Sequence, residues 1–184
     1  NGGSFVDCTF GGGGYSKEIL KFPKTKVIAL DRDSSVKNEA EKIKKKYLNR
    51  FSFYNEKFSN LNKVLGKTKA DVIIFDLGIS TIQLLDMKRG FSFQSKEKID
   101  MSMGLTSLSA EQVINNYSEA DLKSIIKIFG DEKEAYKIVK NIVKERKKKK
   151  ISFVYELVDI IKKSKKKKYS KKINIYKKTF KKII

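Results

Sequence analysis

The sequence has no histidine and only one cysteine, Cys8, among its 184 residues. A histidine general base and histidine metal ligands are therefore excluded within this chain, and a single cysteine leaves too few ligands for a zinc site. One cysteine cannot form an intrachain disulfide, so the composition favours a reducing compartment. We therefore expect a cytoplasmic protein that binds no metal.

Long apolar runs are also missing, since no segment approaches the roughly 20 apolar residues needed to cross a bilayer. We accordingly expect no membrane association.

Acidic residues are few: 21 Asp and Glu stand against 42 Lys and Arg, and only four of the basic residues are Arg. Residues 133–184 hold 21 of the basic residues and four of the acidic ones. A segment of this kind binds polyanions through phosphate contacts, which makes RNA or DNA the expected partner. The lysine preference of an AT-rich genome explains part of the bias.

The first half of the chain has the pattern of an open, doubly wound α/β sheet. Phe5–Thr9 predicts a strand that runs into the glycines at 11–14 and then a helix to Leu20. Further strands are predicted at 26–30, 51–54 and 71–75, with helices at 35–47 and 61–65. The strand at 71–75 is too apolar to be half exposed, so we expect it to be buried. The βαβ order implies parallel strands and right-handed crossovers.

From Ser109 onward the apolar period becomes 3.6, which predicts helices at 110–117, 120–129, 133–147 and 153–163. We therefore predict an α/β core over 1–105, a helical subdomain over 106–172, and a return to the core over 173–184. The lysine-rich breaks at 147–150 and 162–172 are expected to be exposed connections or a phosphate-facing surface. Both termini fall within patterned sequence, so we expect a fragment truncated at both ends.

The glycine run and the acid that follows the second strand indicate a nucleoside cofactor. Glycine adopts φ > 0 and lets a ligand approach the backbone closely. Asp31 lies 18 residues after Gly13, at the end of the second predicted strand, where a carboxylate can accept protons from both ribose hydroxyls of an adenosine. NAD and S-adenosylmethionine both carry adenosine, so these two features leave both cofactors open.

The segment that follows the fourth strand adds a carboxylate, Asp76, and a hydroxyl, Ser80. Open α/β folds bind their ligands at this carboxyl edge. Methyl transfer to a cytosine amine needs such a group, because an acceptor that holds an amine N–H localises the nitrogen lone pair and aligns it with the methyl carbon. The alternative is that Asp76 only caps a loop.

Several motifs together are distinctive, above all the run Arg-Gly-Phe-Ser-Phe at 89–93. The others lie at 6–11, 13–16, 29–33, 58–59, 76–80, 83–86 and 100–101. With these motifs the chain resembles the small-subunit rRNA cytosine-N4 methyltransferases, the RsmH (MraW) family. The resemblance covers nearly the whole chain.

The resemblance implies a Rossmann-like class I methyltransferase, with a doubly wound, mostly parallel sheet that is incomplete here and is interrupted after the fourth strand by an inserted helical subdomain. The predicted helices at 106–172 fit that substrate-recognition insert. The implied activity is S-adenosylmethionine-dependent methylation of N4 of a cytosine in the decoding region of 16S rRNA, either naked or in the small ribosomal subunit. The oligomeric state stays open, with a dimer as one alternative.

The resemblance also implies the site. Asp76 and Ser80 are the expected catalytic residues, with Asp76 between the cofactor and the target amine. Asp31 is expected at the ribose, the glycine turn at the methionine moiety and Phe58 near the adenine. The full set of implied cofactor-binding residues is Gly13, Gly14, Tyr15, Asp31, Phe58, Asp76 and Gln83.

The sequence departs from the family pattern at a few positions. Tyr15 replaces a frequent histidine, Ile82 replaces a proline, and Ser102 and Gly104 replace an arginine and an aspartate. One alternative function is therefore a catalytically inactive RNA-binding module that uses the lysine-rich C-terminal region. A NAD-dependent oxidoreductase is a further alternative, but it gives no role to Asp76 or to residues 89–93. Phe91 and Phe93 fit either a stacking role on a flipped base or a place in the core.

Overall fold

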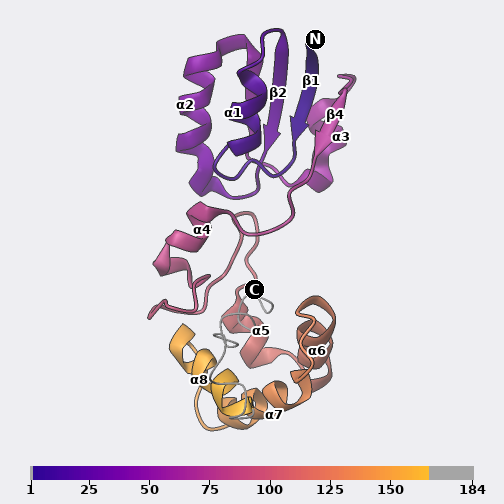
Figure 1. Cartoon of the computed structure of the whole chain (residues 1–184). Helices are drawn as coiled ribbons and strands as arrows, with labels where there is room; N and C mark the ends of the chain where they lie inside the picture. Colours follow the sequence, from indigo (N-terminus) through magenta and orange to yellow (C-terminus); the bar gives the residue numbers. More distant parts are fainter. Residues whose placement is uncertain (1, 166–184) are drawn as a thin grey trace. The chain divides into compact units, whose positions relative to one another are not determined.

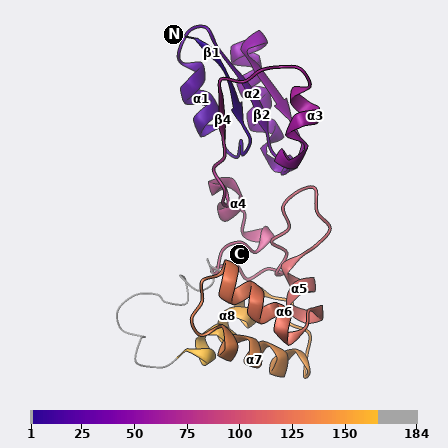
Figure 2. The ribbon, with the colours of Figure 1, turned by 90° about the vertical axis from the view of Figure 1, so that its right-hand side faces the viewer.

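The computed structural model describes residues 2–165 and divides the chain into two compact units. The α/β unit comprises the chain up to Gln83 together with Met103–Thr106. The helical unit comprises Leu84–Ser102 and the described residues from Ser107 onward. Figures 1 and 2 show the elements of each unit from two sides.

The α/β unit contains a parallel four-stranded sheet in the order β3-β2-β1-β4, which confirms the predicted fold class. The strands are β1 (Gly3–Asp7), β2 (Thr25–Leu30), β3 (Phe51–Tyr54) and β4 (Val72–Ile74). The helices of this unit are α1 (Gly14–Leu20), α2 (Lys37–Tyr47) and α3 (Leu61–Leu65), with short 3-10 turns η1 (Ser34–Val36), η2 (Leu48–Arg50) and η3 (Phe58–Asn60). The next helix, α4 (Thr81–Leu85), begins in this unit and ends in the helical unit, to which the 3-10 turn η4 (Met87–Arg89) belongs. The order of strands and helices along the chain matches the predicted order.

Side chains of β2 alternate between two apolar clusters, one on each face of the sheet. Val27 and Ala29 pack with α1 and α2, in a cluster that also includes Phe10, Leu20, Val36, Ala40, Ile43 and Phe51. Leu30 packs on the opposite face with Val6, Cys8 and the apolar side chains of α3. Helices therefore cover both faces, as expected for a doubly wound sheet.

Two strand predictions need correction. β1 ends at Asp7 and not at Thr9, because the Asp7 carboxylate accepts a hydrogen bond from the Thr9 N–H (3.3 Å) and starts the turn. The prediction that the fourth strand is buried was wrong: Val72 and Ile73 are 43% and 45% exposed. Within the described residues β4 pairs with β1 alone, so it lies at the edge of the sheet. Apolar composition marks a strand but does not fix what packs over it.

The helical unit is built around one apolar cluster of 14 buried residues. Its helices are α5 (Ala110–Asn116), α6 (Glu119–Ser124), α7 (Ala135–Arg146) and α8 (Val154–Ser164), with a π-helical turn η5 (Ile125–Phe129) after α6 (Figure 2). The predicted helical stretch is confirmed. No helix in the described part of the chain is long and apolar enough to cross a bilayer.

Residues 84–102 belong to the helical unit, although the predicted division placed them with the α/β core. The Ile99 N–H donates to the Ser152 carbonyl (2.8 Å) and the Val154 N–H donates to the Glu97 carbonyl (3.0 Å), so this segment is bonded to the start of α8. Phe91 is 1% exposed and the Arg89 guanidinium lies 5.1 Å from its ring centroid. Phe91 is thus a core residue. The predicted return at 173–184 lies outside the described residues.

Candidate cofactor site at the carboxyl edge of the sheet

The turn between β1 and α1 depends on glycine. Gly11 and Gly13 have φ of +51° and +74°. A Cβ on Gly13 would lie 2.7 Å from Ile43 Cδ1 and 2.9 Å from the Phe10 ring, so only glycine fits there. A Cβ on Gly14, in contrast, would meet nothing within 4 Å. The turn therefore packs on the core on one side and leaves its backbone accessible to a ligand on the other.

The Asp31 carboxylate is fixed beside this turn by two backbone donors. Its Oδ2 accepts a hydrogen bond from the Gly11 N–H (2.7 Å) and its Oδ1 accepts one from the Asp33 N–H (2.8 Å). Burial raises the pKa of the Asp31 carboxyl, and the two backbone hydrogen bonds oppose that rise. Each carboxylate oxygen keeps a further lone pair, which a ribose hydroxyl can use.

A buried pair, Asp7 and Ser16, braces the same turn from inside. Both residues are 0% exposed, and the Ser16 hydroxyl donates to Asp7 Oδ2 (2.7 Å). Burial raises the pKa of the Asp7 carboxyl, and the hydrogen bond from Ser16 works against it. The pair ties the end of β1 to α1. Sequence reasoning gave neither residue a role of its own; an acid at the end of an apolar strand just before a glycine turn is the signal that could have found it.

The segment that follows β4 reaches the end of β1. The Asp76 N–H donates to Thr9 Oγ1 (2.8 Å), and the Cys8 N–H donates to the Ile74 carbonyl (3.0 Å). The Asp76 side chain is exposed. An ideal Cβ on Gly11 would lie 3.3 Å from Ser80 Cβ, so the structure brings Ser80 against the glycine turn. Thr9 is a residue of this candidate site that sequence reasoning missed.

Gln83 links the segments after β2 and β4. It is 5% exposed; its Nε2 donates to Asp33 Oδ2 (2.6 Å), and its Oε1 accepts from the Ser80 N–H (2.8 Å). The Ser80 hydroxyl in turn accepts from the Gln83 N–H (3.2 Å). Gln83 thus positions Ser80 against Asp33, and its direct contact with a cofactor stays a prediction.

Two predicted aromatic residues are only partly covered. Phe58, in η3, is 43% exposed and meets Phe75 edge to face, with ring centroids 5.6 Å apart. This contact brings the segment after β3 to the end of β4. Tyr15 is 50% exposed in the first turn of α1. Half-exposed rings of this kind offer apolar faces to a purine, in line with the role predicted for Phe58.

A strap formed by Met103–Thr106 packs against the segment after β2. The Arg32 Nε–H donates to the Met103 carbonyl (2.8 Å), and the Leu105 N–H donates to the Arg32 carbonyl (3.2 Å). Gly104 has φ of +55°, and a Cβ there would collide with the Arg32 carbonyl oxygen. The strap therefore needs glycine at 104, which gives a physical reason for one departure from the family pattern.

These features are typical of an α/β domain that binds a nucleoside-containing cofactor: a glycine turn after the first strand, an acid after the second, and polar groups after the fourth. Residues 2–165 contain no group of three or more Cys, Asp or Glu side chains placed to hold a metal ion.

Comparison with known proteins agrees with this class. The model of the MraW methylase family matches residues 1–184, and the chain belongs to this family. A ribosomal RNA small subunit methyltransferase H of Orientia tsutsugamushi (strain Ikeda) is 46% identical over 159 residues, which are 86% of this chain and 51% of that protein. The protein of the same name from Neorickettsia sennetsu is 42% identical over 172 residues, 93% of this chain and 58% of that protein. The chain thus spans little more than half the length of these relatives.

Proposed function

We propose that this chain carries the cofactor-binding part of an S-adenosylmethionine-dependent methyltransferase that modifies N4 of a cytosine in the decoding region of 16S rRNA. The substrate is the rRNA or the small ribosomal subunit, which makes the cytoplasm the proposed place of action. Family membership supports the methyl-transfer chemistry, and the names of the relatives support the substrate.

The observation that carries the proposal is the 2.7 Å hydrogen bond from the Gly11 N–H to Asp31 Oδ2. It joins the turn proposed for the methionine moiety to the carboxylate proposed for the ribose. A ligand that contacts both the turn and the carboxylate therefore meets a preformed surface, so little conformational entropy is lost on binding. Gly13, Gly14, Tyr15 and Phe58 are proposed to complete the cofactor site, with Gln83 acting through Ser80 and Asp33.

Asp76 and Ser80 are the proposed catalytic residues. The exposed Asp76 carboxylate can accept a hydrogen bond from the cytosine amine, which favours the localised nitrogen lone pair needed for attack on the methyl carbon. Its backbone is held by Thr9 and that of Ser80 by Gln83. Such anchoring maintains the alignment of nucleophile, methyl carbon and sulfur that an in-line transfer requires.

The cofactor half of the proposal is tested by a thermal-shift titration with S-adenosylhomocysteine and, in parallel, NAD. A ligand at about 100 times its Kd stabilises the folded state by roughly 2.7 kcal/mol. S-adenosylhomocysteine is expected to give this stabilisation and NAD is not. Asp31→Asn keeps the shape of the side chain but removes its charge, and it is expected to weaken binding at least tenfold, or by about 1.4 kcal/mol.

The catalytic half is tested by methyl transfer from labelled S-adenosylmethionine to small subunits that lack the modification. Asp76→Asn is expected to lower the rate by at least about a hundredfold, in the range of lost acid–base assistance, while cofactor affinity falls much less. A folded protein that binds neither S-adenosylhomocysteine nor NAD would contradict the proposal. Cofactor binding without transfer would favour the catalytically inactive RNA-binding module.

A further inference from the structure

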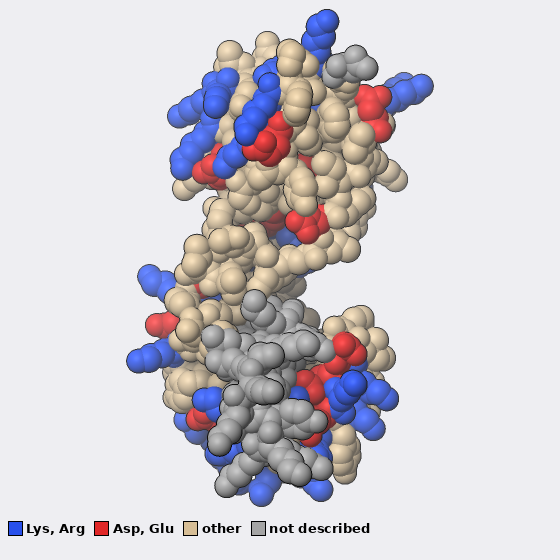
Figure 3. Space-filling view, in the orientation of Figure 1, with Lys and Arg blue, Asp and Glu red and all other residues tan. Residues whose placement is uncertain are grey.

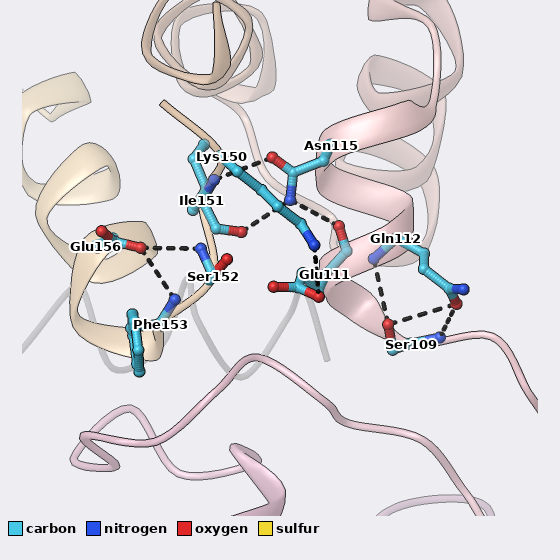
Figure 4. Close-up of polar contacts among 9 residues, drawn as sticks. All are labelled: Ser109, Glu111, Gln112, Asn115, Lys150, Ile151, Ser152, Phe153 and Glu156. Carbon is cyan, nitrogen blue, oxygen red and sulfur yellow. Dashed lines mark hydrogen bonds and ion pairs between the residues drawn. The ribbon is translucent and has the colours of Figure 1, made fainter. Parts of the chain in front are cut away.

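The lysine loop, residues 147–150 between α7 and α8, is held firmly at its C-terminal end. Asn115 on α5 makes a two-way contact with Ile151: its Nδ2 donates to the Ile151 carbonyl (2.8 Å) and its Oδ1 accepts from the Ile151 N–H (3.0 Å) (Figure 4). The same Nδ2 also donates to the Glu111 carbonyl (2.8 Å). Ile151 itself is 3% exposed. The four lysines therefore project from a backbone that is fixed at one end.

Two carboxylates extend this anchor. Glu156 Oε2 accepts from the N–H groups of Ser152 (2.8 Å) and Phe153 (3.0 Å) and so caps the start of α8. Burial raises the pKa of the Glu156 carboxyl, but these hydrogen bonds and the Lys149 ammonium outweigh burial and hold that pKa below its ordinary value. Figure 4 also shows Lys150 reaching Glu111 on α5, at 3.1 Å. The C-terminal end of the loop thus has a defined geometry.

A pocket of about 220 Å³ opens beside the loop. Its basic lining residues are Lys148, Lys149, Lys150 and Lys163, and Ile151 and Ile160 add apolar surface. The three lining carboxylates each pair with a lysine: Glu145 with Lys148 at 2.9 Å, Glu156 with Lys149 at 3.0 Å, and Asp159 with Lys162 at 3.4 Å. Lys144 and Lys147 are also exposed close by in sequence, so the surroundings stay basic. Figure 3 shows Lys and Arg side chains gathered around the visible edge of the helical unit.

One aromatic residue, Tyr155, lines this pocket. The Tyr155 ring stacks on Phe153, with centroids 5.5 Å apart and an interplanar angle of 21°. Tyr155 is 48% exposed. A ring that is already stacked on one face and exposed elsewhere is a platform on which a base can stack at little cost in order.

We propose that this lysine pocket binds a single-stranded stretch of RNA, with phosphates on its lysines and a base on Tyr155. The proposal rests on the rRNA substrate proposed above and adds a contact on the helical unit, distinct from the cofactor residues of the α/β unit. Proteins that bind single-stranded nucleic acids combine basic side chains, which contact the phosphates, with aromatic rings, on which the bases stack. A duplex would use the lysines but leave the ring without a base.

The test is fluorescence anisotropy with a short single-stranded RNA and the 184-residue protein, at salt concentrations between about 50 and 200 mM. Tyr155→Ala is expected to weaken binding at least about fivefold, and Tyr155→Phe, which keeps the ring, less than about twofold. Lys163→Gln is expected to reduce the slope of log affinity against log salt by about 0.7, the value for one phosphate contact of a single strand. Tyr136→Ala and Lys137→Gln are matched controls, because both residues are exposed on α7 and outside the pocket.

Each outcome decides the proposal. Loss with the pocket variants but not with the α7 controls, at unchanged S-adenosylhomocysteine binding, supports it. Equal RNA binding by all variants overturns the pocket and leaves the proposed function intact. Binding to anionic vesicles or to duplex RNA as tight as to single strands, with no effect of Tyr155→Ala, overturns it in favour of a general basic surface. A wild-type chain that binds S-adenosylhomocysteine but no RNA overturns the pocket and counts against the RNA substrate, not against the cofactor.

Discussion

The acids at the glycine turn of the α/β unit and the acids of the helical unit are held in opposite ways. Burial raises the pKa of Asp7 and of Asp31, and their partners are backbone N–H groups and a serine hydroxyl. In the helical unit the Ser152 side chain lowers the pKa of Glu111, and the Lys148 ammonium lowers that of Glu145. The first group of acids holds the turn between β1 and α1, while the second forms ion pairs with lysines.

The apolar cores of the two units also differ. The helical unit buries one continuous cluster, whereas the α/β unit has two smaller clusters and a half-exposed edge strand, β4. The glycine turn is the feature to test in the α/β unit, and the side-chain anchor at Asn115 is the feature to test in the helical unit. Substitutions that change only one of these features measure its contribution to the stability of its own unit.

The largest effect is expected from Gly13→Ala in the α/β unit. The new Cβ takes a left-handed φ of +74° and presses on Ile43 and Phe10, so overpacking and strain together should cost about 2–4 kcal/mol. Urea unfolding followed by circular dichroism measures the loss. Gly14→Ala is the control, because its Cβ would meet open space, and it should change stability by less than about 0.5 kcal/mol. Equal losses in both variants would contradict the packing explanation.

The next largest effect is expected from Asn115→Ala in the helical unit. The change leaves the buried backbone N–H and carbonyl of Ile151 without their partners, at a cost of about 1–3 kcal/mol. Asn116→Ala is the matched control, since Asn116 is exposed on the same helix. Native-state hydrogen exchange should show faster exchange at Ile151 in the first variant only. Unchanged protection there would mean that the lysine loop is held by other contacts.

Sequence reasoning predicted most of the fold because the pattern is local. The glycine turn, the strand that ends before Asp31 and the four-helix stretch all follow from residues close together in the chain. Burial of β4 could not be predicted, because it depends on which segments pack over the strand. The Asp33–Gln83 and Arg32–Met103 contacts were missed for the same reason: they join residues 50 and 71 positions apart.

A smaller effect, confined to the strap at 103–106, is expected from Gly104→Ala. The new Cβ would collide with the Arg32 carbonyl oxygen, so the strap should detach and the Leu105 N–H should exchange about fivefold faster, as expected for one lost hydrogen bond. Gly66→Ala is a close control, because Gly66 has the same φ of +55° but faces open space. It shares the backbone strain without the collision, and Leu105 should stay protected.

The smallest effect is expected from Asp7→Asn, which tests whether the buried carboxyl of the α/β unit costs stability. Because burial raises the folded-state pKa of Asp7 above its ordinary 3.8, the folded state binds its proton more tightly than the unfolded state. The free energy of unfolding should therefore fall as pH rises from 3.8 through the raised pKa, by no more than about 1.4 kcal/mol per pH unit.

Asn at position 7 keeps the shape of the side chain and can donate to the Ser16 hydroxyl, so the Asp7→Asn variant should have a flatter pH profile and be the more stable protein above that window. Ser16→Ala removes a hydrogen bond that lowers the pKa of Asp7 and should extend the fall to higher pH. Urea unfolding at a series of pH values measures all three proteins, and parallel profiles for wild type and Asp7→Asn would show that Asp7 carries no such cost.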